Sequence, residues 1–126
     1  MMKVMNHYHA YNVALDVEQL KHISGGDLEF ERELLALYIE DAANHLSRLR
    51  GAISANNFLA VEETAHHLKG ASGNVGLTDM QHYATELEIA ARQHQAARFV
   101  VLTAEMEQIL AQLQHAFSHS VDQQPV

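Results

Sequence analysis

The sequence predicts an all-α protein: an antiparallel up-down four-helix bundle with a short N-terminal helix as a lid. Apolar residues recur at spacings of three and four along most of the chain, and no alternating strand pattern of useful length occurs. One proline and six glycines among 126 residues leave long stretches free to be helical. This length fits one domain, so we expect a flexible lead-in over residues 1–15, the bundle over residues 16–117 and a flexible tail over residues 118–126.

Start and stop signals divide the expected helices. The lid helix ends in a Ser-Gly-Gly stretch, after which Asp27 is a good N-cap for a long second helix. Asn57 starts the third helix, and Gly76 ends it. Thr78 and Gln81 have the spacing of a capping box, which opens the fourth helix. A last amphipathic stretch completes the bundle.

The apolar stripes of these helices predict a shared core. The third helix has one narrow buried seam, made of Phe58, Val61, Ala65, Leu68, Ser72 and Val75. Three residues are expected to widen the stripe of the second helix, namely Phe30, Leu34 and Leu37. His94 is expected to extend the core face of the fourth helix.

Composition excludes several classes of function. Sixteen acidic residues against eight basic ones give a formal charge of −8, which disfavours nucleic acid and anionic membrane surfaces as partners. No segment approaches the roughly 20 apolar residues of a transmembrane helix, and the polar start is unlike a signal peptide. No cysteine is present, so disulfides and zinc-thiolate sites are excluded. We therefore expect a cytoplasmic protein.

The third helix carries an unusual histidine. At about 100° per residue, His66 lies roughly 140° from the centre of the seam, on the solvent side, with Gly70 and Gly73 within about 40° of it. Each glycine costs about 1 kcal/mol relative to alanine inside a helix. The two glycines therefore indicate a surface that is kept clear around an exposed histidine, so that another protein can approach closely.

The surroundings of this histidine suit phosphoryl transfer. Lys69 lies one turn beyond His66 and offers a positive charge to an incoming dianionic phosphoryl group. A histidine with a pKa of about 6.5 is roughly three-quarters neutral at pH 7, so it needs no dedicated base to act as a nucleophile. His67 lies about 120° from the seam on the other flank, and periodicity alone does not exclude it as the acceptor. The two glycines favour His66.

The same residues resemble a known family. The run from His66 to Ser72, together with Gly76, is similar to the signature of histidine phosphotransfer (HPt) domains, and the resemblance covers about residues 17 to 115. The sequence departs from the family pattern at two minor points: His67 is an extra histidine beside His66, and Ala84 stands where the resemblance suggests a cysteine.

The resemblance implies a role for each of these residues. His66 is the phospho-acceptor, Lys69 steadies the phosphoryl group, and Gly70 gives a receiver domain room to dock. Gly73, Glu63 and His67 complete the expected docking surface. The implied partners are receiver domains of response regulators, of a hybrid sensor kinase, or of both. We expect a monomeric carrier without kinase activity of its own, with no cofactor and no metal, since Mg²⁺ is required only on the partner receiver.

Alternative functions are a phosphoacceptor dimerisation domain of a sensor kinase and a helical module that docks receivers without phosphotransfer. In the kinase domain an acidic residue normally follows the histidine and a proline lies just beyond, whereas His67 follows here and the chain's one proline is Pro125. A metal-binding bundle is a further alternative. His115 and His119 have a chelating spacing, and so do His7 and His9, but neither pair has a well-placed third ligand.

Overall fold

The computed structural model describes residues 15–122 of the chain, and the side chains of residues 15–118. Its helices are α1 (Val17–Ser24), α2 (Leu28–Ser54), α3 (Phe58–Asn74), α4 (Thr78–Arg92) and α5 (Phe99–Asp122), with a 3₁₀ turn, η2 (Ala96–Arg98), before α5.

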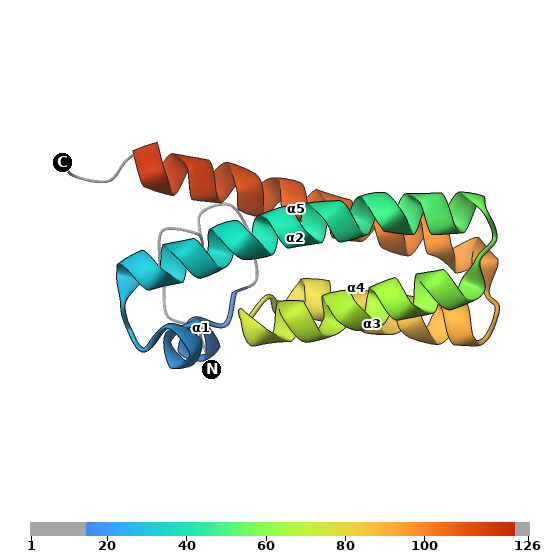
Figure 1. Cartoon of the computed structure of the whole chain (residues 1–126), viewed down its shortest axis with the longest axis horizontal. Coiled ribbons are helices and arrows are strands. Elements are labelled where there is room, and N and C mark those ends of the chain that lie inside the picture. Colours follow the sequence, from blue (N-terminus) through green and yellow to red (C-terminus); the bar gives the residue numbers. More distant parts are fainter. Residues whose placement is uncertain (1–14, 123–126) are drawn as a thin grey trace.

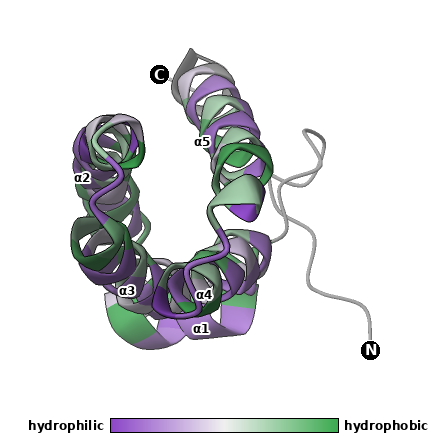
Figure 2. Cartoon of the chain, turned by 90° about the vertical axis from the view of Figure 1, so that its right-hand side faces the viewer, coloured by the Kyte–Doolittle hydropathy of each residue, from purple (hydrophilic) through white to green (hydrophobic). Residues whose placement is uncertain are grey.

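The four long helices form the predicted bundle. Figure 1 shows α2 and α5 along one long side of the molecule and α3 and α4 along the other. Helix α3 packs against α2 and α4, and α5 packs against α4 and α2, so the four helices surround a common core. The end view in Figure 2 shows this order around the bundle, with α1 beneath one end. Helix α1 contacts α2 and α3, as expected of a lid.

The core contains one continuous cluster of buried apolar side chains from all five helices. The seam of α3 is confirmed: Val61, Ala65, Leu68 and Ser72 are fully buried. Within the core, the hydroxyl groups of Tyr38 and Ser72 form a hydrogen bond of 2.7 Å. Burial raises the pKa of Tyr38 to about 12, so its hydroxyl is neutral.

Two of the predicted helix starts are confirmed by side-chain caps. Asp27 accepts a hydrogen bond from the backbone N–H of Phe30, and Asn57 caps α3 in the same way. The capping box at Thr78 is wrong, because Thr78 is already the first residue of α4. The N-cap position is occupied by Leu77, whose side chain is buried in the core. Burial of Leu77, rather than a polar cap, fixes where this helix begins.

The turn after α3 is tied to the segment that leads into α1. Leu15 and Leu77 form an isolated antiparallel bridge, and the N–H of Asp16 donates to the carbonyl of Gly76 over 2.7 Å. Gly76 has a φ of 81°, and a Cβ there would lie 2.5 Å from the carbonyl oxygen of Asp16. Only glycine fits this close approach. Leu15, expected in the flexible lead-in, is thus buried, whereas residues 1–14 lie outside the described part of the chain.

Three expectations about the apolar stripes and helix ends need correction. Phe30 and Leu37 are 43 % and 66 % exposed, because only one face of α2 meets the other helices. Helix α4 ends at Arg92, so His94 lies in the following turn with a φ of 57°, where its ring stacks on Phe58 instead of entering the core. Helix α5 continues to Asp122, beyond the expected end at residue 117.

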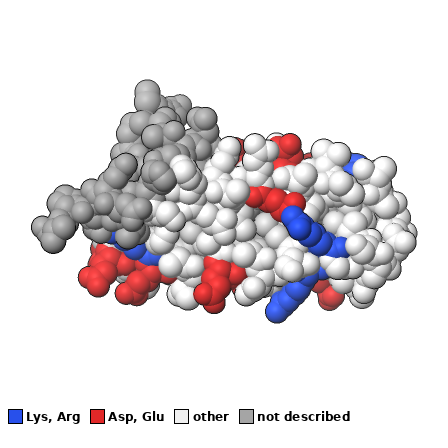
Figure 3. All heavy atoms as spheres, turned by 90° about the horizontal axis from the view of Figure 1, so that it is seen from above, with Lys and Arg blue, Asp and Glu red and all other residues white. Residues whose placement is uncertain are grey.

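Charged side chains are sparse on the face formed by α2 and α5. In Figure 3 most of the described surface of this face is uncharged, and one acidic group lies directly beside a basic group near its middle. None of the helices within residues 15–122 combines the length and the apolar character that crossing a bilayer requires.

Candidate functional site

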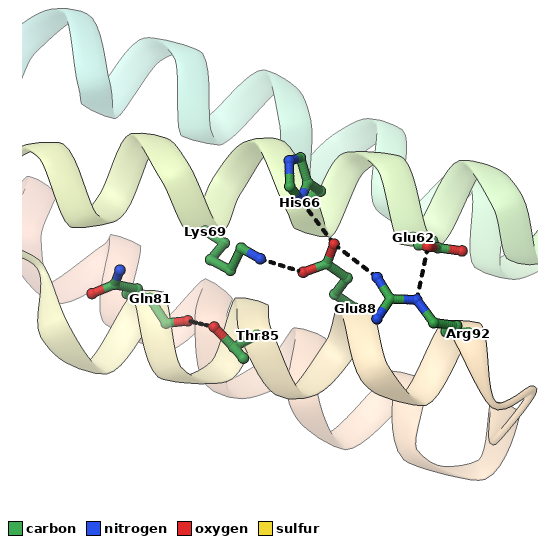
Figure 4. Close-up of polar contacts among 7 residues, drawn as sticks. All are labelled: Glu62, His66, Lys69, Gln81, Thr85, Glu88 and Arg92. Carbon is green, nitrogen blue, oxygen red and sulfur yellow. Dashed lines mark hydrogen bonds and ion pairs between the residues drawn. The ribbon is translucent and has the colours of Figure 1, made fainter.

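His66 lies on the outer face of α3, as its position opposite the seam predicts. Its side chain is 67 % exposed, whereas Ala65 and Leu68 on the same helix are fully buried. The ring leans toward α4, where its Nδ1 lies 2.8 Å from a carboxylate oxygen of Glu88 (Figure 4). The histidine is therefore both accessible to a partner and held by a fixed contact.

Three side chains contact the carboxylate of Glu88. Besides His66, Lys69 donates from Nζ to Oε1 over 2.7 Å, and Arg92 donates from Nη2 to Oε2 over 3.3 Å. Arg92 also donates to Glu62 over 3.1 Å. Glu88 itself is only 8 % exposed, so these contacts lie partly out of water, where charge-assisted hydrogen bonds are strong. Figure 4 shows the carboxylate between α3 and α4 with its three partners around it.

The ionised state of Glu88 determines which nitrogen of the neutral His66 ring carries the proton. Burial raises the pKa of Glu88, but the hydrogen bonds and positive charges of Lys69 and His66 outweigh burial, so the pKa lies below its ordinary value. The carboxylate is thus ionised at neutral pH and can only accept hydrogen bonds. Nδ1 of His66 must then be the donor, which leaves the lone pair of the neutral ring on Nε2. In the neutral ring, Nε2 is therefore the unprotonated nitrogen, and it lies on the side of the ring away from Glu88's hydrogen bond.

Lys69 lies beside His66 as expected, but its ammonium group already has a partner. It lies one turn after His66 on α3 and is 32 % exposed, but its ammonium group is engaged by Glu88. The cation is therefore held beside the histidine by an acidic partner on α4, a contact that the helical spacing within α3 does not reveal.

The two glycines of the motif differ in their surroundings. A Cβ on Gly70 would meet nothing within 4 Å, so this position is open, as expected of a surface that a partner approaches. A Cβ on Gly73 would lie 2.6 Å from the side-chain amide of Gln81 on α4. The flexible Gln81 side chain thus occupies the space beside Gly73, and the role of Gly73 in docking stays a prediction.

Two more predicted docking residues lie beside His66. Glu63 is exposed and lines a shallow surface hollow with His66, Glu88 and Arg92. His67 turns the other way, toward α2, where its Nε2 lies 2.9 Å from Asp41. The two histidines thus face different neighbouring helices, and each ring contacts a different carboxylate.

Glu88 and Arg92 are the site residues that sequence reasoning missed. Glu88 directly follows the core residue Leu87 and lies four residues after the core residue Ala84. A carboxylate at the edge of an apolar stripe could have marked Glu88 as a site residue, because a buried acidic group needs hydrogen-bonding or charged partners. Its pairing with α3 depends on how the two helices pack, which periodicity does not specify.

The fold and site together define a helical bundle with an exposed histidine on the outer face of α3, beside a carboxylate of α4. A model of the Hpt domain family matches residues 33–116, so the chain belongs to this family. The family's members carry phosphoryl groups between receiver domains in two-component phosphorelays, and this chain functions in histidine phosphotransfer. A comparison with curated proteins gave no significant match.

Two solved structures are similar to this chain. Histidine-containing phosphotransfer protein B (HptB) from Pseudomonas aeruginosa PAO1 is 28 % identical, with a TM-score of 0.80 over 89 % of this chain and 97 % of the other. The HPT domain of a hybrid sensor histidine kinase from Shewanella has a TM-score of 0.72 over 96 % of this chain and 100 % of the other. Because this second structure is only 16 % identical to the chain, its similarity shows a shared fold and nothing more.

Proposed function

We propose that His66 is the phospho-acceptor and that Nε2 is the atom that carries the phosphoryl group. The observation that carries this proposal is the 2.8 Å contact between Nδ1 and the ionised carboxylate of Glu88 on an otherwise exposed ring. It leaves Nε2 unprotonated in the neutral ring, without any base having to remove a proton first.

The transfer step needs little from this chain besides the positioned ring. Nε2 of His66 attacks the phosphorus of a phosphoaspartate on the partner receiver, so that an N–P bond forms while the P–O bond to the aspartate breaks. The aspartate leaves as a carboxylate, and the proton on Nδ1 stays in the hydrogen bond to Glu88. Lys69 offsets the charge of the incoming phosphoryl group. Mg²⁺ belongs to the receiver, and this step uses no cofactor on the carrier.

The receiver is proposed to dock over the outer face of α3. Gly70 keeps the space beside His66 open, and Leu59, which is 65 % exposed, supplies an apolar contact at the same hollow. Glu63, His67 and Gly73 complete the proposed surface. The receivers can belong to a response regulator, to a hybrid sensor kinase, or to both.

Several properties follow from this role. The carrier has no kinase activity of its own, because phosphoryl groups both arrive from and leave to receivers. We propose that it works as a monomer in the cytoplasm, where response regulators are found, and that neither nucleic acid nor a membrane is among its partners.

The test is a phosphotransfer assay with a phosphorylated receiver domain. His66→Gln is expected to lose phosphoryl acceptance while its helical circular dichroism spectrum stays the same, because the ring is exposed and packs against little. His82→Gln is the matched control, since His82 is an exposed histidine on α4 outside the site. Label that is retained by His66→Gln, or that moves to His67, would refute the assignment. Receiver binding without any transfer to the wild-type protein would favour a docking module instead.

A further inference from the structure

A second cluster of ligand-bearing side chains lies on the other flank of α3. His67 on α3 faces Asp41 and His45 on α2, and one ligand atom from each of the three lies within 4.8 Å of the others. Nε2 of His67 is 2.9 Å from Oδ2 of Asp41, and Nδ1 of His45 is 3.3 Å from Oδ1. Each oxygen of one carboxylate thus has an imidazole nitrogen beside it.

We propose that Asp41, His45 and His67 form a binding site for a late first-row divalent metal ion such as Zn²⁺. Two imidazoles and one carboxylate are a common ligand set for such ions. In a tetrahedral site with metal–ligand bonds of about 2.0–2.1 Å, neighbouring ligand atoms lie about 3.3 Å apart. The two nitrogen–oxygen separations in the cluster, 3.3 and 2.9 Å, are near that value, although they run to different oxygens of Asp41, so the carboxylate must also turn for one oxygen to face both rings.

Metal binding requires a local adjustment of the two rings and of the Asp41 carboxylate. The rings of His45 and His67 now stack with centroids 3.9 Å apart and an interplanar angle of 10°, so they must rotate about χ2 for both lone pairs to meet at one point. His45 also gives up the hydrogen bond between its Nδ1 and the backbone carbonyl of Asp41. The His67 side chain is about half exposed, at 49 %, so the ring has room to turn and a fourth coordination position opens to solvent.

The position of this site gives it a consequence for signalling, which rests on the proposed function. His67 directly follows His66, and it belongs to the proposed docking surface. An ion bound there would fix His67 to α2, add positive charge beside the acceptor and occupy part of the surface that a receiver must cover. We therefore infer that metal binding lowers receiver docking, so the ion is an inhibitor of transfer and not a cofactor.

Zinc binding can be measured without any transfer assay, by competition with a chromophoric chelator on the full chain. Wild type is expected to bind one Zn²⁺ at this site. Because even outer-shell partners of a metal site are worth about 10- to 100-fold in affinity, His45→Gln, His67→Gln and Asp41→Asn should each lower it by more than about tenfold. His115→Gln and a His7→Gln/His9→Gln double variant are controls that remove the other histidine pairs and should retain the site.

Co²⁺ provides a second readout, because its visible absorption bands report tetrahedral coordination by the protein. These bands should appear with wild type and disappear with Asp41→Asn, which keeps both rings and the size of the side chain. Equal zinc affinity in wild type and in the His45 and His67 variants would refute the site. So would a loss of binding in the control variants alone.

The effect on transfer is tested separately. Zn²⁺ should slow phosphoryl acceptance by wild type but not by His45→Gln, since His45 lies outside the proposed docking surface. If zinc binds at the cluster but transfer is equally sensitive in both proteins, the inhibitory role is wrong while the metal site stands. If His66 proves not to be the acceptor, the binding measurements still decide whether the site exists.

Discussion

Replacing Glu88 by glutamine tests whether this carboxylate prepares His66 for attack. The side chain keeps its size, but an amide can either accept from or donate to Nδ1, so it no longer dictates which nitrogen holds the proton. A hydrogen bond to a charged group contributes about 1.5–3 kcal/mol, against about 0.5–1.5 kcal/mol for a neutral one. The loss of about 1.5 kcal/mol corresponds to a rate of phosphoryl acceptance that is about tenfold lower.

The same substitution changes the pH dependence of stability. Because the pKa of folded Glu88 lies below its ordinary value of 4.5, its contribution is present above that ordinary value and is lost as the pH falls through the folded pKa. Glu88→Gln lacks this contribution and leaves Lys69 and Arg92 without their shared carboxylate. Wild type should therefore be more stable than the variant at pH 7, and the difference should shrink as the pH falls below the ordinary value of 4.5 and through the lower pKa of the folded state.

The assay combines rapid-quench phosphotransfer with NMR detection of the His66 tautomer and urea unfolding at several pH values. Glu86→Gln is the matched control, because Glu86 lies on the same helix and pairs with Arg98 instead of His66. An unchanged rate together with an unchanged tautomer in Glu88→Gln would show that the carboxylate only joins the two helices. A stability difference that persists at low pH would show that its charge contributes nothing to folding.

Three further substitutions test other parts of the site. Lys69→Ala should slow transfer by about fivefold without abolishing it, since a partly exposed charge contributes about 1 kcal/mol, and an unchanged rate would make Lys69 a surface charge only. Gly70→Leu should raise the melting temperature by a few degrees, because leucine gains about 0.8 kcal/mol of helix propensity at a position with open space around it. The same variant should abolish receiver binding. A lower melting temperature would show that Gly70 is needed for packing between helices. Gly76→Ala should lower stability by about 2 kcal/mol or more, because of its positive φ and the approach of Asp16, and a chemical denaturation curve that matches wild type would contradict this.

Features encoded by local periodicity could be predicted from the sequence. The seam of α3 follows from apolar spacing alone, and the exposure of His66 follows from its angle to that seam. The caps at Asp27 and Asn57 are local as well, because each depends on a side chain reaching a backbone N–H three residues on.

Features that depend on how helices pack could not be predicted in this way. Glu88 meets His66 across 22 residues of sequence, and Gly73 meets Gln81 only because α3 and α4 lie close together. Leu77 replaced the expected polar cap because its burial in the core outweighs one side-chain hydrogen bond at the start of α4.

The hydrogen bond between Nδ1 of His66 and Glu88 also bears on how the phosphoryl group leaves. With Nε2 phosphorylated and Nδ1 still protonated, the ring is a cation that the adjacent carboxylate stabilises. When a second receiver attacks the phosphorus, the electron pair of the N–P bond returns to the ring, and the leaving group is neutral imidazole instead of an imidazolate anion. We therefore propose that this one contact lowers the barrier both for loading of the phosphoryl group onto His66 and for its release.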